Sequence, residues 1–305
     1  MLFNIIKLIH IFKIAALILL IFLKRVSLTF ELMTAENIKD PIHFTREQHT
    51  IYSTYLERDV LLDAYVPSDF IQPELFHLLL INDGQDLLKM PFTAILEEFA
   101  VTAEAEPLFC IGIHCGEERK REYGTAFAAD FENRGDKAGL YSKFIFDELL
   151  PFIRRYYQAP SFKEKSFAGF SLGGLSALDI VWNHPNEFCK AGIFSGSLWW
   201  RRKAYEAGYE DEKDRLMHLQ VLKGGFYPWL RFFFECGTLD ETADRNNNGV
   251  IDSIDDTLDL IVELKIKGYT DEHIGYYLVE EGRHDVETWA KSFPAFLNWG
   301  WHKKQ

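Results

Sequence analysis

The segment Gly169-Phe170-Ser171-Leu172-Gly173 has the residue types and spacing of a G-x-S-x-G nucleophile turn. Such a turn joins a strand to a helix and projects the serine hydroxyl above the sheet, while the flanking glycines tolerate the strained backbone. The backbone N–H after the serine lies at a helix N-terminus, where it can stabilise a developing oxyanion. The pattern predicts nucleophilic catalysis by Ser171. The alternative is an ordinary serine N-cap at a glycine-rich turn.

A serine nucleophile needs a histidine base and a carboxylate that orients the base. One arrangement orders these groups along the chain as serine, then aspartate or glutamate, then histidine. Of the ten histidines, only His284 stands on a loop after the last expected strand, which suits the base. Asp240 lies just past the Gly237 turn that is expected to end the preceding strand, so it is the predicted acid. Glu241 and Asp244 compete for that role, because an acidic loop could equally be a solvated surface.

Two backbone amides are predicted to form the oxyanion hole. One is the N–H of Leu172, directly after the nucleophile, and the other belongs to the loop that leaves an early central strand. That strand is expected over Leu75–Ile81, and Gln85 occupies the matching position in the Asn-Asp-Gly-Gln loop that follows. Only the main chain of Gln85 would take part, so its side-chain type carries little weight.

Aromatic and guanidinium side chains stand close together near a second strand end. Trp199, Trp200 and Arg201 follow a Ser-Gly-Ser turn, and Arg119 lies on another loop of the same expected sheet edge. Aromatic planes beside guanidinium groups suit a flat, anionic aromatic ligand. These four residues are the predicted substrate-binding groups. The alternative is a buried aromatic cluster with solvated arginines.

The segment from Asp244 to Asp255 fits the calcium-loop pattern D-x-[DN]-x-[DN]-G. Gly249 supplies the sharp turn, and the apolar Ile251 would anchor the loop to the core. An EF-hand has a bidentate Glu at position twelve, whereas this segment carries a shorter Asp there and so resembles dockerin-type loops. The predicted oxygen ligands are Asp244, Asn246, Asn248, the Val250 carbonyl, Asp252 and Asp255. The alternative is a turn whose acidic side chains cap the next helix. A bound calcium ion would be structural, because the expected ester hydrolysis needs no cofactor.

Composition limits the classes of partner. The 305 residues are 48% hydrophobic and 15% aromatic, which supplies a large core and excludes wholesale disorder. The net charge of −13 argues against nucleic-acid binding, because a polyanion needs a basic surface. The four cysteines are scattered and form no C-x-x-C pair, so no disulfide framework is expected. The expected partner is a small-molecule ester.

The N-terminal residues 1–32 form an apolar segment ahead of the expected domain, 33–305. Its uninterrupted part, Ile14–Leu23, is short for a membrane span, which needs about 20 residues, and no A-x-A-like cleavage site follows. We predict a cytoplasmic protein whose true start is Met33. The alternatives are export or membrane anchoring through residues 1–25, and a structured extension. Membrane contact is expected only if this segment is real.

Short β-rich runs alternate with amphipathic helical stretches, without internal repeats. Strands are expected over Thr50–Leu56, Val60–Val66, Leu75–Ile81, Leu108–Ile113, Ser166–Phe170, Ala191–Phe194, Arg231–Glu235 and Ile274–Val279. Helices are expected from Phe92 to about Ala105, Tyr141 to about Tyr157, Leu172 to near His184, about Ile254 to Lys267, and Val286 to Trp299. The alternation predicts an α/β fold, with a mostly parallel central sheet and helices on both faces. Chemistry in such sheets sits on loops at the carboxyl ends of strands.

Four segments occur in order along the chain: LLLINDGQDLL, ELLPFIRRYY, AGFSLGGLSALDIVWNHPNEF and SGSLWW. Together they resemble the Putative esterase family of the α/β-hydrolase superfamily, which includes enterochelin esterases and esterase D. The resemblance spans roughly Leu75 to Trp301. It implies the α/β-hydrolase fold and ester hydrolysis through Ser171 and His284, with the acid after Gly237. Family members act on siderophore trilactones and on feruloyl, acetyl or S-formylglutathione esters, so the resemblance fixes the chemistry better than the substrate.

The predicted function is a serine carboxylic-ester hydrolase that forms an acyl-enzyme on Ser171 and acts on siderophore-type or other aromatic or acyl esters. Two other classes compete. One is a non-catalytic, calcium-dependent ligand-binding protein on the same fold, and the other is an acyltransferase in which an alcohol replaces water. The chain order of Ser171, Asp240 and His284 favours catalysis over mere binding. Product analysis separates transfer from hydrolysis.

Overall fold

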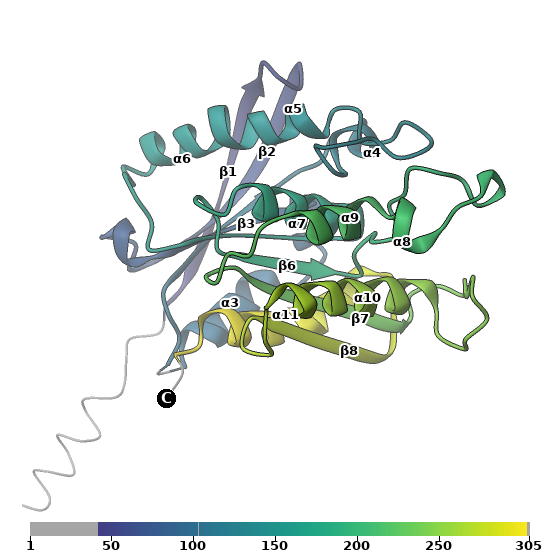
Figure 1. Ribbon diagram of the computed structural model, residues 1–305. Helices are drawn as coiled ribbons and strands as arrows, with labels where there is room; N and C mark the ends of the chain where they lie inside the picture. Colours follow the sequence, from purple (N-terminus) through teal and green to yellow (C-terminus); the bar gives the residue numbers. More distant parts are fainter. Residues whose placement is uncertain (1–41, 103, 304–305) are drawn as a thin grey trace, which may run out of the picture. The chain divides into compact units, whose positions relative to one another are not determined.

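A single eight-stranded sheet forms the centre of the protein (Figure 1). The computed structural model describes residues 42–102 and 104–303, which belong to one compact unit. The strands are β1 (Phe44–Ser53), β2 (Arg58–Pro67), β3 (His77–Asn82), β4 (Leu108–Ile113), β5 (Lys165–Phe170), β6 (Lys190–Phe194), β7 (Arg231–Leu239) and β8 (Ile274–Arg283). Their order across the sheet is β1-β2-β4-β3-β5-β6-β7-β8. The expected segment 1–32 lies outside the described residues.

The sheet is antiparallel at one edge and parallel elsewhere. β1 pairs antiparallel with β2, and β2 pairs antiparallel with β4. Every pairing from β4 through β3, β5, β6 and β7 to β8 is parallel. The carboxyl ends of the parallel strands therefore all lie on the same side of the sheet. The loops that leave these ends are close in space although they are far apart in sequence.

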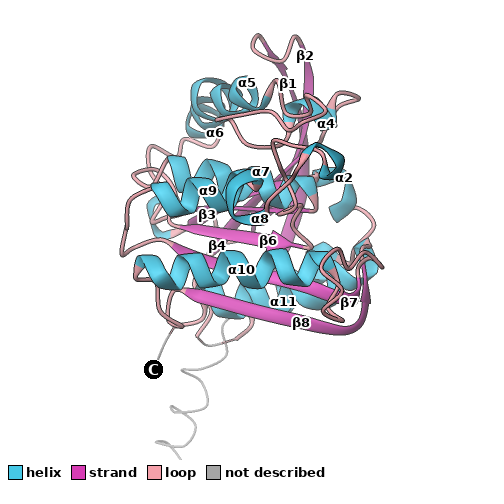
Figure 2. Cartoon of the chain, turned by 45° about the vertical axis from the view of Figure 1, so that its right-hand side comes forward, coloured by secondary structure: helices cyan, strands magenta, loops and turns pink. Residues whose placement is uncertain are grey.

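Helices cover both faces of this sheet (Figure 2). The longer ones are α3 (Phe92–Ala100), α5 (Ala138–Lys143), α6 (Leu150–Tyr156), α7 (Leu172–Asn183), α9 (Leu216–Lys223), α10 (Asp252–Lys267) and α11 (Val286–Trp301), with a π-helical turn, η2 (Phe144–Leu149), between α5 and α6. The short ones are α2 (Gly84–Leu87), α4 (Arg119–Glu122) and α8 (Asp211–Asp214), with 3-10 turns η1 (Pro73–Leu75) and η3 (Tyr205–Ala207). One hydrophobic cluster contains side chains of α6, α7, α9 and α10, and a second contains those of α3 and α11. The expected α/β fold with helices on both faces is confirmed.

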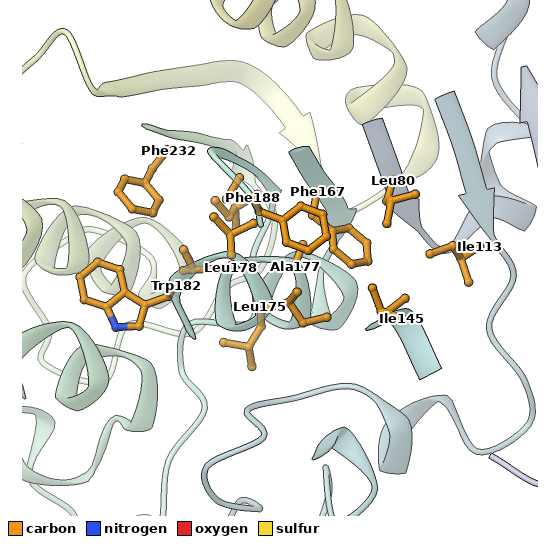
Figure 3. Packing of buried hydrophobic residues seen from close by; sticks show 14 of the residues in the cluster. Leu80, Ile113, Ile145, Phe167, Leu175, Ala177, Leu178, Trp182, Phe188 and Phe232 are labelled. Carbon is orange, nitrogen blue, oxygen red and sulfur yellow. The ribbon is translucent and has the colours of Figure 1, made fainter. Parts of the chain in front are cut away.

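Helix α7 is almost entirely buried and most of its residues are apolar, and the predicted nucleophile turn lies at its start. Its residues Leu175, Ala177 and Leu178 are fully buried and lie beside Phe167 of β5 and Phe188 (Figure 3). Full burial of a leucine or phenylalanine side chain contributes about 1.5–3 kcal/mol. This packing fixes α7 and β5 relative to each other, and with them the turn between them.

Most expected elements are present with shifted ends. The strand Leu108–Ile113 has the predicted bounds, whereas β1 begins at Phe44, earlier than the expected Thr50. The prediction that Gly237 ends its strand is wrong, because β7 continues through a β-bulge to Leu239 and pairs there with β8. Among residues 42–102 and 104–303, no helix is long and apolar enough to cross a membrane.

Candidate active site

Ser171 stands at the sharp turn between β5 and α7. Its backbone has φ 55° and ψ −120°, a strained conformation for a residue with a side chain. Its N–H donates to the Phe194 carbonyl of β6 at 2.8 Å, which holds the turn against the neighbouring strand. A Cβ on Gly169 would lie 2.4 Å from the Gly173 carbonyl oxygen, so only glycine fits there. The turn thus has the geometry expected of a nucleophile turn.

Two backbone N–H groups near this turn have no acceptor within the described part of the chain. They belong to Leu172, directly after Ser171, and to Gln85 in α2. The Gln85 side chain is held in place, since its Oε1 accepts from the Cys115 N–H at 3.1 Å and its Nε2 donates to Asp83 Oδ1 at 3.3 Å. Unpaired amides fixed at a loop and at a helix start are what an oxyanion hole requires.

Arg119 anchors the loop that carries Gln85. Its Nε and Nη2 donate to the two carboxylate oxygens of Asp83 at 2.7 and 2.6 Å. Asp83 is fully buried and has a left-handed backbone with φ 59°. Nη2 of Arg119 also donates to the Phe170 carbonyl at 3.3 Å, one residue before Ser171. The charge of Arg119 is therefore paired with Asp83, and its contact with Phe170 joins the loop of Gln85 to the turn at Ser171.

Asp240 and His284 follow the ends of two adjacent strands. Leu239 of β7 pairs with Arg283 of β8, and the two predicted catalytic residues come next on each chain segment. Asp240 Oδ1 accepts from the Ser195 hydroxyl at 3.1 Å. Within the described residues, the buried Oδ2 of Asp240 has no hydrogen-bond partner, which leaves it free to accept from a histidine ring.

Burial sets the protonation of this pair. It lowers the pKa of His284, and the Arg119 charge lowers it further, while the nearby Asp240 opposes both effects. Burial also raises the pKa of Asp240, against hydrogen bonds from Gly237 and Ser195 and the charge of His284. A histidine with a lowered pKa is neutral at neutral pH and can act as a base.

We expect the acid limb of the pH profile of kcat/KM to have its midpoint below about 6.5, the ordinary histidine pKa. The reason is that His284, with its lowered pKa, stays in the basic form to a lower pH than an exposed histidine would. The measurement is kcat/KM for a short p-nitrophenyl ester between about pH 4.5 and 9. A midpoint well above 6.5 would contradict the assignment.

Near Asp240 and Ser171 lie four residues that the sequence did not single out, namely Trp289, Ser195, Glu235 and Ser197. Trp289 of α11 donates through Nε1 to Ser195 Oγ at 2.9 Å, and Ser195 Oγ in turn donates to Asp240. Glu235 of β7 is almost fully buried beside them, and burial raises its pKa to about 8, with the Asp240 charge adding to the shift. Ser197 Oγ lies 3.4 Å from Ser171 Oγ. The only sequence signal for Ser195 and Ser197 is the Ser-Gly-Ser turn after β6.

The four predicted substrate-binding residues do not all lie in one place in the structure. Trp199 and Arg201 line a pocket of about 440 Å³. Trp200 is fully buried and packs against Gly124 and Gly135, so it supports the wall rather than facing a ligand. The prediction that Trp200 contacts substrate is corrected for this reason. Arg119 lies elsewhere, in its ion pair with Asp83.

The predicted calcium loop leads into α10. Its Asp255 carboxylate accepts from the amides of Asn246 and Asn248 at 2.9 and 2.7 Å. Asp244 accepts from the Asn248 and Gly249 backbone N–H groups at 3.1 and 2.9 Å. Four of the six predicted ligands therefore converge, including both carboxylates at the ends of the loop.

The remaining side-chain ligand, Asp252, is turned to Arg245, with Oδ1 3.3 Å from Nη1. Residues 42–102 and 104–303 contain no cluster of three or more His, Cys, Asp or Glu side chains placed to hold a metal. The donors of this loop are instead mixed carboxylate, amide and carbonyl oxygens. Such a hard oxygen set suits calcium rather than a transition metal.

Comparison with known proteins identifies related sequences and folds. A sequence model of the family described as Putative esterase matches residues 53–299. Uncharacterized protein YjcH of Bacillus subtilis (strain 168) is 22% identical over 235 residues, which are 75% of this chain and 88% of that protein.

Several solved structures share the fold. One is the enterobactin esterase FES from Shigella flexneri in the presence of enterobactin, with a TM-score of 0.64 and 19% identity over 83% of this chain. The match covers 57% of that longer protein, so this chain spans less than two thirds of its length. Another is the siderophore hydrolase EstB from Aspergillus nidulans, with a TM-score of 0.60 and 16% identity, covering 85% of this chain and 96% of EstB. At these identities the likeness establishes the fold.

Proposed function

The chain belongs to the Putative esterase family of carboxylic ester hydrolases, and from this premise we propose that it works through an acyl-enzyme on Ser171. The observation that carries the proposal is the strained Ser171 turn beside the unpaired N–H groups of Leu172 and Gln85. Asp240 and His284 at the neighbouring strand ends supply the acid and the base. The same α/β-hydrolase fold in solved esterases supports this arrangement.

In the proposed first step, Ser171 Oγ attacks the ester carbonyl carbon while His284 takes the hydroxyl proton. The carbonyl oxygen becomes an oxyanion that accepts hydrogen bonds from the Leu172 and Gln85 N–H groups. The C–O bond to the alcohol then breaks, and His284 delivers its proton to the leaving oxygen. Asp240 holds the imidazole in the productive tautomer throughout. The product of this step is an acyl ester on Ser171.

In the second step, water attacks the acyl-enzyme while His284 again serves as base, and the carboxylic acid leaves Ser171. An acceptor alcohol in place of water would make the protein an acyltransferase. The free acid is therefore the product that identifies hydrolysis. The substrates we propose are aromatic-acyl and siderophore-type esters, because solved relatives of the fold include an enterobactin esterase, a siderophore hydrolase and a ferulic acid esterase.

The proposal is tested by short p-nitrophenyl esters together with a serine-reactive fluorophosphonate probe. We expect turnover with release of the free acid, and a single probe adduct on the peptide that contains Ser171. A protein that neither turns over these esters nor reacts with the probe would instead be a non-catalytic ligand binder on this fold.

We further propose that the loop from Asp244 to Asp255 binds a structural calcium ion. The support is the spacing of its oxygen donors and the convergence of Asp244, Asn246, Asn248 and Asp255. No step of the reaction uses the ion. Its role would be to fix the segment that joins Asp240 to α10.

Calcium is expected to raise the melting temperature of EDTA-treated protein by several degrees. A ligand at about one hundred times its Kd stabilises the folded state by about 2.7 kcal/mol, and about 1 kcal/mol shifts the melting temperature of a domain this size by roughly 2–4 °C. Differential scanning fluorimetry with calcium or magnesium measures the shift. The Asp255→Ala variant should lose it, whereas Glu263→Gln on the same helix should keep it. An equal shift in Asp255→Ala would place the ion elsewhere.

A further inference from the structure

The pocket of about 440 Å³ that Trp199 and Arg201 line contains an arginine without an ionic partner among the described residues. Its lining residues are Phe131, Glu132, Arg134, Trp199, Arg201, Tyr205, Glu241, Ala243, Asp244, Arg245 and Asp252. Trp199 lies two residues after Ser197, whose hydroxyl is 3.4 Å from the nucleophile, and Glu241 directly follows Asp240. The pocket volume is in the range of sites for single small molecules.

Arg201 is held by aromatic rings instead of by carboxylates. Its guanidinium carbon lies 3.9 Å from the Tyr205 ring centroid, 4.6 Å from that of Phe131 and 5.9 Å from that of Trp199. Its Nε is buried and has no hydrogen-bond partner within the described residues. A buried donor without a partner is costly, so the described residues do not compensate this guanidinium at Nε.

The neighbouring arginines do not share this condition. Arg134, Arg202, Arg215 and Arg245 each have a carboxylate partner within 3.3 Å, among them Asp130, Asp214 and Asp256. Arg201 has no carboxylate within salt-bridge distance in the described part of the chain. Among the residues that the structure describes, Arg201 is therefore the pocket arginine without a carboxylate partner.

The acids of the pocket are mostly compensated. Glu132 pairs with Arg134 at 3.1 Å, and Asp252 lies 3.3 Å from Arg245. The Asp244 carboxylate accepts from two backbone N–H groups of its own loop. Glu241 stands in a half-buried place near other carboxylates, and burial raises its pKa, which favours its neutral form. Because these carboxyl groups are paired, hydrogen-bonded or favoured in the neutral form, Arg201 is the group of the pocket that would attract an anion.

We propose that this pocket binds a negatively charged group of the ester substrate through Arg201, with the aromatic rings of Phe131, Trp199 and Tyr205 around it. The substrate class is therefore an ester that carries an anionic group, such as a carboxylate, in addition to the bond that is cleaved. A guanidinium held by ring faces is oriented in advance, so it can present its remaining donors to a planar anion. This inference rests on the proposed esterase function.

The test compares charged and neutral esters of matched shape. Mono-4-nitrophenyl adipate against 4-nitrophenyl hexanoate places the charge in the acyl part, and 4-acetoxybenzoate against its methyl ester places it in the alcohol part. We expect the charged member of at least one pair to have a kcat/KM about ten- to a hundredfold higher, the range of a charged hydrogen bond. The pair that responds shows on which side of the scissile bond the pocket lies.

Arg201→Gln should abolish this preference, which is measured as the ratio of kcat/KM for the charged ester to kcat/KM for the neutral ester of the same pair. Arg201→Lys should keep part of it, and Arg202→Gln, one residue further and paired with Asp214 outside the pocket, should keep all of it. Thermal melting establishes that each variant folds. The proposal is overturned if neither pair shows a preference for the anion, or if Arg201→Gln retains it.

Failure of the esterase function itself would look different, since all four esters would then be inert. In that case, calorimetric titration with 4-hydroxybenzoate and monomethyl adipate judges the anion site alone. Binding by the parent protein that Arg201→Gln loses would support the site without catalysis. Absence of binding to the parent would dismiss it.

Discussion

Ser171→Ala is expected to lower kcat/KM for p-nitrophenyl esters about 10⁶-fold. The alanine removes the hydroxyl that would form the proposed acyl-enzyme, while the proposed oxyanion donors, the N–H groups of Leu172 and Gln85, remain. These amides and the substrate pocket can still support a residual rate of about 10³–10⁴ over water, because their contacts do not depend on the hydroxyl. Steady-state assays at high enzyme concentration measure the loss.

A matched control for this variant is Ser197→Ala, because Ser197 Oγ is the hydroxyl nearest to the nucleophile, at 3.4 Å. We expect Ser197→Ala to keep most of its activity and to react with the fluorophosphonate probe, in contrast to Ser171→Ala. If Ser171→Ala retained turnover, Ser171 would not be the nucleophile. If Ser197→Ala lost all activity at the same time, the nucleophile would be Ser197.

Asp240→Asn is expected to lower kcat by about 10⁴ without unfolding the protein. An amide in place of the carboxylate can still accept the Ser195 hydroxyl, so the local structure persists. The amide cannot balance the positive charge that develops on His284, and its NH₂ group favours the wrong histidine tautomer. The measurement is kcat of Asp240→Asn at the pH optimum of the parent protein. Circular dichroism shows whether the variant is folded.

The two competing acids provide the controls. Glu241→Gln and Asp244→Asn each remove a carboxylate from the same loop, and each should lower kcat by less than about tenfold. Glu241 follows Asp240 but lines the pocket, and Asp244 accepts from the backbone of its own loop. If Glu241→Gln were the variant with the 10⁴-fold loss, Glu241 and not Asp240 would be the acid.

Elements with a strong hydrophobic pattern could be predicted from sequence, because burial alone defines them. The strand Leu108–Ile113 is buried at every position and has the expected bounds. The prediction that the strand ends at Gly237 is wrong, because a glycine after a β-rich run can mark a turn or a bulge within the strand. In the structure a Cβ on Gly237 would lie 2.4 Å from the Gly282 carbonyl oxygen, so this glycine permits close contact between β7 and β8. A pairing of this kind joins residues 45 positions apart and leaves no local signal.

The candidate site was predictable where its residues follow from local motifs. Ser171 and the residues after β7 and β8 could be named from the turn and the strand order. The partner of Arg119 is Asp83, 36 residues away, so sequence alone gave no reason to regard this arginine as already paired. The two consecutive tryptophans illustrate the same limit. Trp199 lines the pocket and Trp200 is in the core, and only the path of the backbone decides which of them faces outward.

The position of β8 at the end of the sheet order has a consequence for synthesis on the ribosome. The chain emerges with β5 and its serine turn more than one hundred residues before His284. A domain generally folds as a unit, and synthesis proceeds at about 5–20 residues per second. A nascent chain that ends before β8 would therefore carry Ser171 without its proposed base, His284. Catalysis would begin only when the last strand docks, which keeps an incomplete enzyme inert until its fold is finished.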